Sequence, residues 1–189
     1  MFKALRNQSF LFYKDIPVSW LSTIHSFSKK RLSWMLLLLF VVFFELCALY
    51  FQHVLMLAPC VMCVYERVAM MGVGAAAMVG LIQPKNHLIR WLSLAGWGYT
   101  SFRGLQLAIE HVGYQFNPSP FATCDIFPQF PSWAPLNQLA PWMFEPTGDC
   151  SKIVWQFLNL SMPQWLVVIF SANLVVLSLV IIAQFFKSK

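Results

Sequence analysis

Four long apolar runs divide the chain, at approximately 32–52, 63–82, 88–108 and 164–186. A helix needs roughly 20 residues to cross a hydrocarbon core of about 30 Å, and each run reaches that length. Lipid offers backbone groups no hydrogen-bond partners, so segments that cross it must be helical. The pattern predicts an all-α membrane protein, a four-transmembrane-helix bundle with a long external loop at 109–163.

Composition agrees with a membrane location. Hydrophobic residues make up 59% of the 189 residues and charged residues only 11%, with a mean hydropathy of +0.63. These values lie outside the range of ordinary soluble domains. The first run starts late and lacks a small-residue cleavage site, so it is not a signal peptide. We expect an N-terminal extension at 1–31, a membrane domain at 32–186 and a short tail at 187–189.

The lysines and arginines predict the orientation. Ten of the thirteen precede the first run, lie in or next to the short turn between the second and third runs, or follow the fourth: Lys3, Arg6, Lys14, Lys29, Lys30, Arg31, Lys85, Arg90, Lys187 and Lys189. By the positive-inside rule both termini are cytoplasmic and the long loop is external. The net charge of +6 is therefore a topology signal, and no basic face remains for nucleic acid.

Two segments outside the apolar runs have helical periodicity. In 16–28, apolar residues fall on one face, which is typical of a helix in the membrane interface; a poorly ordered tail is the alternative. The long loop holds eight of the eleven prolines and cannot be one continuous helix. Within it, the spacing of Trp133, Leu136, Leu139 and Met143 predicts a short interfacial helix anchored by its tryptophans; a buried loop cluster is the alternative.

Small residues recur every four positions in the second and third runs. Such stripes let membrane helices approach closely, so we expect these two helices to contact each other along them. The stripes are Gly72, Ala76 and Gly80, and Gly96, Thr100, Gly104 and Ala108.

Four of the five cysteines fall at or beyond the external edge, where disulfides can persist: Cys60, Cys63, Cys124 and Cys150. Sequence alone permits three pairings. Local geometry favours one, because a C-x-x-C pair at a helix start can close on itself and leaves the two loop cysteines to pair. Cys47 lies inside the first apolar run, where a thiol reacts poorly.

Two polar residues near this pair extend the candidate site. Cys63 falls in the first turn of a helix, whose dipole favours a thiolate. Arg67 follows four residues later on the same helical face, although it could also snorkel to the headgroups. Glu66 could pair with a cation, and His111 lies at the external end of the third run.

These residues favour electron transfer by thiol–disulfide exchange. The chain has no flavin fingerprint and no iron–sulfur spacing, so a lipid-soluble quinone is the simplest electron acceptor. It would dock where Cys63, Arg67 and His111 could converge.

Several motifs, in order along the chain, resemble the disulfide bond formation protein B (DsbB) family. They are "FQHV", "PCVMCVYER", "FRGLQLAIEH", "PSPFATCD", "GDC" and "MPQWL". The resemblance implies a four-helix enzyme of the bacterial inner membrane. Such an enzyme reoxidises the periplasmic thiol oxidase DsbA and reduces ubiquinone or menaquinone.

The resemblance also implies residue roles. Cys60 and Cys63 correspond to the quinone-coupled pair, and Cys124 to the cysteine that DsbA attacks, which releases Cys150. Arg67 would stabilise the Cys63 thiolate and the reduced quinone. Three more residues match positions expected around the quinone ring: Leu107, His111 and Met162. The extension at 1–30 and Cys47 lie outside the resemblance.

Other interpretations stay open at this stage. A related oxidoreductase could serve a different partner or run in reverse as a quinol-dependent reductase. A membrane scaffold could carry two structural disulfides. His53 and His111 lie on the same side of the membrane and could ligate a haem, and four cysteines could hold zinc, although we predict no metal site.

Overall fold

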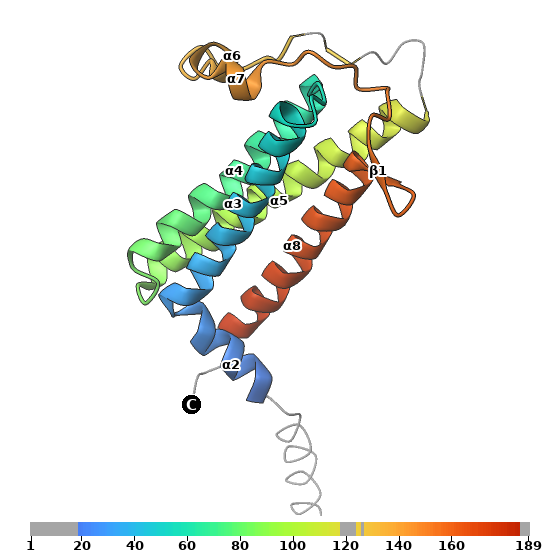
Figure 1. Cartoon of the computed structure of the whole chain (residues 1–189). Coiled ribbons are helices and arrows are strands. Elements are labelled where there is room, and N and C mark those ends of the chain that lie inside the picture. The colour runs from blue at the N-terminus through green and yellow to red at the C-terminus, as the bar shows by residue number, and fades with distance from the viewer. Residues whose placement is uncertain (1–18, 118–123, 126, 186–189) are drawn as a thin grey trace, which may run out of the picture.

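The computed structural model of the chain describes residues 19–117, 124–125 and 127–185. Its main feature is a bundle of four long helices, shown in Figure 1: α3 (Arg31–His53), α4 (Val61–Ile82), α5 (His87–Phe116) and α8 (Met162–Gln184). The four apolar runs therefore form helices, as predicted. The third helix continues beyond its predicted end at 108, and the predicted tail at 187–189 lies outside the described residues.

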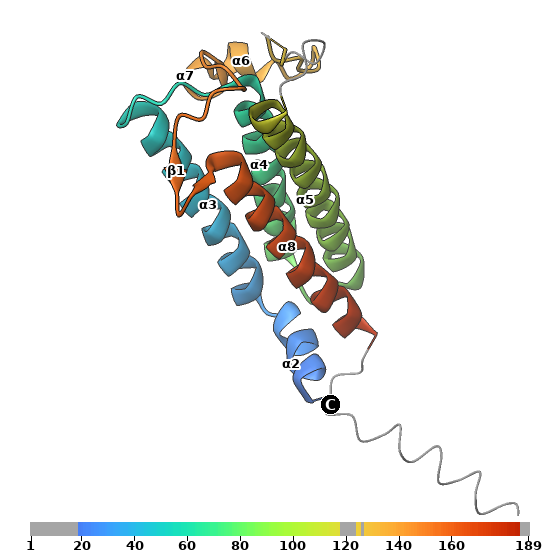
Figure 2. The ribbon, with the colours of Figure 1, turned by 90° about the vertical axis from the view of Figure 1, so that its right-hand side faces the viewer.

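Three of these helices are long and apolar enough to cross a membrane: α3, α4 and α8. The fourth, α5, carries Arg90, Arg103 and Glu110 and is less apolar. It is nevertheless an integral part of the bundle, because it packs against both α4 and α8 (Figure 2). The protein is thus a largely helical membrane protein with at least three helices suited to span a bilayer.

The packing around the bundle is uneven. Helix α4 packs closely on α3 and on α5, and α5 packs closely on α8. Within the described residues, α3 and α8 do not pack closely on each other. A cavity of about 540 Å³ lies on this side, lined by residues of α3, α4 and α8.

Small residues make the close helix contacts, although not all in the predicted place. Gly72 of α4 faces Thr100 of α5, and Gly96 faces Ala76, which confirms the predicted contact between these helices. Gly80 instead receives the ring of Trp34 from α3, and Gly104 the ring of Phe170 from α8. The glycine spacing correctly predicted close packing, but it could not show which neighbouring helix fills each gap.

A short helix, α2 (Ser19–Ser28), precedes α3 and packs against the end of α8. The His25 ring nitrogen Nδ1 lies 3.0 Å from the carbonyl oxygen of Ala183, and the Trp34 indole donates a hydrogen bond to the carbonyl of Ser28. These contacts hold α2 against the bundle. The predicted helix at 16–28 therefore exists from Ser19 onwards, and residues 1–18 lie outside the described part of the chain.

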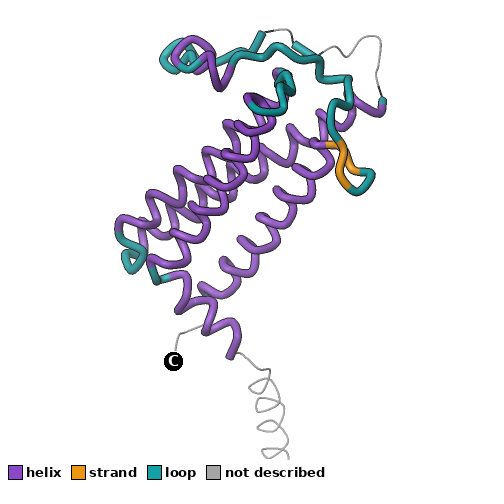
Figure 3. Tube along the Cα trace, in the orientation of Figure 1, coloured by secondary structure: helices purple, strands orange, loops and turns teal. Residues whose placement is uncertain are grey.

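The loop between α5 and α8 covers the opposite end of the bundle (Figure 3). It holds two short helices, α6 (Leu136–Leu139) and α7 (Pro141–Phe144), where the sequence predicted one. The break falls at Ala140, whose φ of −141° and ψ of 67° are not helical. The residue before a proline is disfavoured in the helical region, so Pro141 explains the break.

The same loop contains a small antiparallel hairpin, β1 (Gln156–Phe157) and β2 (Leu160–Ser161), which the all-α prediction missed. Leu158 and Asn159 form its turn with φ values of 51° and 63°. Two consecutive residues with positive φ are typical of a two-residue hairpin turn. Their sequence lacks the usual Asn-Gly or Asp-Gly signal, which is why the hairpin was not predicted.

We predict that Gly104→Ala destabilises the bundle. A methyl group at this position would overlap the Phe170 ring, which is fully buried, and overpacking of this kind typically costs about 1–3 kcal/mol. Gly113→Ala on the same helix is the matched control, because nothing lies within 4 Å of the position that its added methyl group would take. Thermal unfolding in detergent should show a lower midpoint for Gly104→Ala alone; equal midpoints for both variants would contradict the packing.

Candidate functional site

The first cysteine pair lies at the start of α4. Cys60 is the N-cap residue, with extended backbone (φ −87°, ψ 172°), and its sulfur accepts the Cys63 backbone N–H at 3.2 Å. Cys63 is the third helical residue, as predicted, and lies in the turn where the helix dipole favours negative charge. The two sulfurs are 2.6 Å apart and not bonded. This separation is close to that of a disulfide, which is about 2.0 Å.

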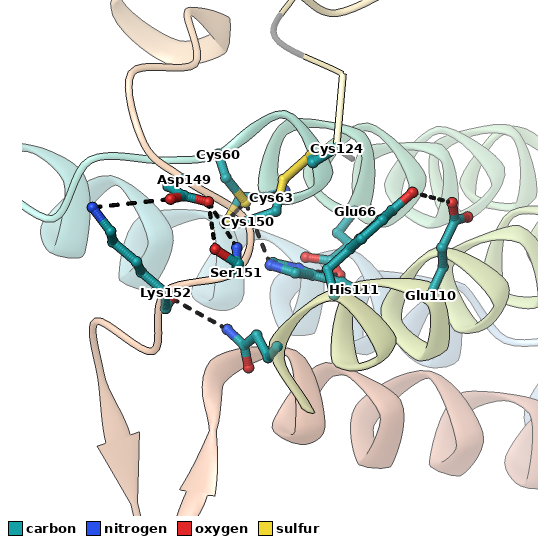
Figure 4. The surroundings of a disulfide bond; sticks show 12 residues. Cys60, Cys63, Glu66, Glu110, His111, Cys124, Asp149, Cys150, Ser151 and Lys152 are labelled. Atoms are coloured by element: carbon teal, nitrogen blue, oxygen red, sulfur yellow. Dashed lines mark hydrogen bonds and ion pairs between the residues drawn. A yellow bond between two sulfur atoms is a disulfide. The ribbon is translucent and has the colours of Figure 1, made fainter. Parts of the chain in front are cut away.

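The second cysteine pair, Cys124 and Cys150, forms a disulfide, as the predicted pairing requires. Cys150 is buried and packs with Cys60 and Met62 in one cluster, against which Cys124 and Cys63 also pack. Figure 4 shows the four cysteines gathered together. Both pairs therefore occupy a single site, although they lie far apart in the sequence.

Backbone hydrogen bonds hold the Cys150 loop against the Cys60 loop. The N–H groups of Thr147 and Gly148 both donate to the Pro59 carbonyl, each at 2.9 Å. Gly148 approaches so closely that a methyl group there would overlap the carbonyl oxygen of Ala58. Glycine is therefore the residue that permits this approach.

A local turn fixes the position just before Cys150. The Asp149 carboxylate accepts hydrogen bonds from the backbone N–H of Ser151 at 3.0 Å and from its hydroxyl at 2.8 Å. These bonds lower the pKa of Asp149 below its ordinary value, so this exposed residue stays anionic. In the motif "GDC", Gly148 thus allows the close approach to the Cys60 loop, Asp149 forms the turn, and Cys150 supplies the sulfur.

His111 of α5 lies against the cysteine pair. Its Nε2 is 3.5 Å from the Cys60 sulfur, and its Nδ1 is 3.0 Å from Oε1 of Glu66. All three residues are buried. Both ring nitrogens are therefore engaged by neighbours within the site, which gives no support to the haem interpretation.

Arg67 lies inside the protein and not among headgroups, because its side chain is only 7% exposed. It donates to Oε1 of Gln52 at 2.8 Å and to the carbonyl of Met143 in α7, and its Nε is 3.5 Å from Oε2 of Glu45. Gln52 in turn donates to the carbonyl of Trp142. The arginine therefore links α3, α4 and the external loop.

Glu45 and Gln52 were missed as site residues in the sequence. An acidic residue in the middle of an apolar run is costly and is by default a functional candidate, so Glu45 could have been identified. Gln52 lies in the motif "FQHV", and nothing in its spacing from Arg67 along the chain indicates a contact. Only the packing of α3 on α4 brings these residues together.

The cavity between α3 and α8 adjoins the cysteine pair. Cys63, Arg67 and Met162 line it, together with aromatic side chains and both acids of the site, Glu45 and Glu66. Two predicted quinone contacts, Leu107 and His111, are not among its lining residues; they pack beside Cys60 instead. Cys47, whose role the sequence left open, also lines the cavity.

This cavity suits a flat apolar ligand with polar ends. Its volume of about 540 Å³ lies within the range of small-molecule sites. Within the described residues, Oε2 of Glu66 is buried without a hydrogen-bond partner, and Oε2 of Glu45 has only its ion pair with Arg67, so polar atoms lie at one end of an otherwise apolar space. A quinone, with an apolar ring and polar oxygens, fits this combination.

The cysteine site also has the spacing of a compact metal site. Ligand atoms of Cys60, Cys63 and His111 lie within 4.8 Å of one another. A pair of thiols that exchanges disulfides needs the same closeness, however, so the spacing requires no metal to explain it.

Comparisons with known proteins agree with this geometry. Residues 30–180 match the family model described as "Disulfide bond formation protein DsbB". The chain is 71% identical over 168 residues to disulfide bond formation protein B of Vibrio parahaemolyticus, covering 89% of this chain and 94% of that protein. Identity to the protein of the same name is 67% in Vibrio cholerae (89% and 97% covered) and 57% in Aeromonas salmonicida (84% and 92% covered).

A helical membrane protein with two adjoining cysteine pairs has the features of a membrane disulfide oxidoreductase. The chain belongs to the disulfide bond formation protein B (DsbB) family, and its function is therefore disulfide formation by an enzyme in a membrane.

We predict that Gly148→Ala weakens the contact between the two cysteine loops. In a Cys63→Ala/Cys124→Ala background, mild oxidation should join Cys60 to Cys150, because the two are packed together. Displacing the loop by the added methyl should slow this crosslink by about tenfold, equivalent to about 1.4 kcal/mol. Gly113→Ala is the control. Non-reducing peptide mapping measures the rate, and an unchanged rate in Gly148→Ala would show that this contact does not position Cys150.

Proposed function

We propose that the protein reoxidises a DsbA-like periplasmic thiol oxidase and passes two electrons to ubiquinone or menaquinone in the bacterial inner membrane. The observation that carries this proposal is the position of Cys63. It belongs both to the cluster of four cysteines and to the lining of the apolar cavity. Electrons collected by the loop disulfide therefore have a short path to a lipid-soluble acceptor.

The proposed topology follows the positive-inside rule. All four long helices, α5 included, cross the membrane, and both termini are cytoplasmic. The loop at 109–163 is periplasmic, and α6 and α7 lie at the membrane surface with Trp133 and Trp142 exposed to the interface. The packing of α5 against both α4 and α8 supports the fourth crossing, because α5 lies alongside two helices that are suited to span the bilayer.

The proposed exchange begins in the loop. A DsbA thiolate attacks Cys124, which breaks the Cys124–Cys150 bond and releases the Cys150 thiolate. Cys150 then attacks the neighbouring Cys60 of an oxidised Cys60–Cys63 pair and releases the Cys63 thiolate. The second DsbA thiol frees Cys124 as a thiolate. Cys124 then attacks Cys150, which breaks the Cys150–Cys60 bond, re-forms the Cys124–Cys150 disulfide and releases Cys60. Two electrons now reside on Cys60 and Cys63, and DsbA leaves oxidised.

The cavity residues support the second half of the reaction. A bound quinone would supply an acceptor for two electrons and two protons. Cys63, Arg67 and Met162 would hold it, and the aromatic walls would exclude water. The fixed charge of Arg67 stabilises negative charge on Cys63 and on the acceptor. Leu107 and His111 support the cysteine pair from the opposite side.

We expect reduced DsbA, mixed anaerobically with the purified protein and a quinone, to produce quinol, as measured by quinol absorbance. Cys60→Ser and Cys63→Ser should each abolish this reaction, because both sulfurs are needed for a two-electron exchange. Cys47→Ala is the matched control: it also lines the cavity but belongs to neither pair, so electron transfer should persist. Without quinol formation by the parent, the disulfides would be structural.

Arg67→Lys should raise the apparent Michaelis constant for quinone. A lysine offers one charge but not the planar fork that contacts Glu45, Gln52 and Met143 at once. Loss of one charge-assisted hydrogen bond costs about 1.5–3 kcal/mol, on the order of ten- to a hundred-fold in affinity.

Single-turnover oxidation of DsbA should change far less in Arg67→Lys, because it occurs at Cys124. Arg103→Lys is the control, since Arg103 is exposed and bonds only to Gln106 on the same helix among the contacts described. Steady-state quinone kinetics that are identical for Arg67→Lys and the parent would remove Arg67 from the quinone site.

A further inference from the structure

A row of hydrogen-bonding groups connects Cys60 to the cavity. The Cys60 sulfur lies 3.5 Å from Nε2 of His111, and Nδ1 of the same ring lies 3.0 Å from Oε1 of Glu66. Figure 4 shows the His111 ring between the cysteines and Glu66. Glu66 also lines the cavity. The row therefore begins at a reacting sulfur and ends at the proposed acceptor site.

The protonation state of Glu66 determines which nitrogen of His111 carries the hydrogen. An ionised carboxylate can only accept hydrogen bonds, so Nδ1 of His111 carries the hydrogen when Glu66 is ionised. In the neutral ring the other nitrogen, Nε2, is then an acceptor, and it faces the Cys60 thiol. A thiol, an imidazole and a carboxyl group in this order form the arrangement in which a base activates a cysteine and is itself oriented by an acid.

The burial of the three residues makes this arrangement specific. Cys60, Glu66 and His111 are each at most 3% exposed, so bulk water does not compete for their protons. The second carboxylate oxygen of Glu66, Oε2, is buried and has no hydrogen-bond partner within the described residues. Such an atom is rare in a native structure and calls for an explanation. A role in receiving or passing on a proton at the cavity provides one.

We infer that His111 is the base that removes the proton of Cys60 when the Cys60–Cys63 disulfide re-forms, and that Glu66 orients the imidazole and passes the proton towards the cavity. This inference rests on the proposed function. His111 touches the reacting sulfur and is a catalytic residue, whereas Glu66 acts through it and is a positioning residue.

The step balances. The S–H bond of Cys60 breaks, an S–S bond forms between Cys60 and the Cys63 thiolate, and two electrons leave for the quinone. The Cys60 proton moves to Nε2 of His111, while the Nδ1 proton moves to Glu66. The quinone takes up two protons. One is the proton that Glu66 receives and passes on. The other comes from water, to which a proton was released when the DsbA thiol ionised.

Other titratable groups nearby do not take this role. Arg67 stays protonated and donates only, and Glu45 lies beside Arg67, not beside His111. Cys63 is the partner sulfur and faces Cys60. On α5 itself, Glu110 is exposed and accepts a hydrogen bond from Tyr114, and among the contacts described it has none with Cys60 or His111. His111 and Glu66 are therefore the pair that can move the Cys60 proton.

The test measures the Cys60 thiol directly, without quinone or DsbA. In the full-length chain with Cys60 as the only cysteine (Cys47→Ala, Cys63→Ala, Cys124→Ala, Cys150→Ala), the rate of alkylation by iodoacetamide reports the reactivity of this sulfur. We expect His111→Gln to lower the rate near neutral pH by about tenfold, the effect of losing one charge-assisted hydrogen bond. The parent rate should also fall as His111 becomes protonated at acidic pH, and this inflection should be absent from the variant.

Glu66→Gln tests the positioning role with a side chain of the same shape. It should lower the alkylation rate and shift the same inflection, and Glu66→Asp should restore part of the rate. Glu110→Gln is the matched control, because this carboxylate is adjacent in sequence but contacts Tyr114. Equal unfolding midpoints would show that the variants fold. Alkylation rates and pH profiles equal to the parent for both His111→Gln and Glu66→Gln would overturn the inference.

The quinone assay separates this inference from the proposed function. The otherwise native chain could reduce quinone while the alkylation profile is unchanged by replacing His111. The proton transfer through His111 and Glu66 would then be wrong, and the proposed function would stand. If alkylation depends on His111 and Glu66 but no quinone is reduced, the activation of the Cys60 thiol by these two residues is confirmed and the proposed electron acceptor is wrong. In the native background, we expect Glu66→Gln to lower the maximal rate of quinol formation more than it changes the Michaelis constant for quinone.

Discussion

The two hydrogen bonds that the Pro59 carbonyl accepts from Thr147 and Gly148 are the contact on which the site depends. They join a segment just before α4 to a loop that follows α5, and thereby bring Cys150 against Cys60. Backbone groups make this contact, so its geometry depends on few side chains. Proline lacks a backbone N–H, but Pro59 contributes only its carbonyl oxygen to this contact, so the missing N–H does not weaken it.

Charged groups in the interior form a second level of organisation. Burying one charge in an apolar setting is strongly unfavourable, and two acids of the bundle, the partly buried Glu45 and the buried Glu66, have basic partners: Glu45 lies beside Arg67, and Glu66 beside His111. Each pair spans two helices, α3 with α4 and α4 with α5. The cost of burial therefore also penalises any arrangement in which α4 shifts along its neighbours, since a shift would separate the partners.

The sequence predicted the bundle well because hydrophobicity and helix length follow directly from the bilayer. It also predicted the cysteine pairing, because C-x-x-C at a helix start leaves few alternatives. It did not predict the ligands of Arg67, since Glu45, Gln52 and Met143 reach it only through packing between distant segments. The sequence likewise did not predict whether the His111 ring faces the cysteines or the membrane. A position at the end of a helix fixes the height of a residue in the membrane but not its partner.

The N-cap position of Cys60 has a consequence for the speed of the proposed disulfide exchange. Its sulfur lies beside Cys63 on one side and packs with Cys150 on the other, so both exchange partners are already within the same buried cluster. Changing partner then requires rotation about the side-chain bonds of one residue, and rotamer changes occur far faster than the movement of whole helices. In the proposed exchange, the step between the two cysteine pairs would then be limited by bond chemistry at sulfur and not by movement of helices.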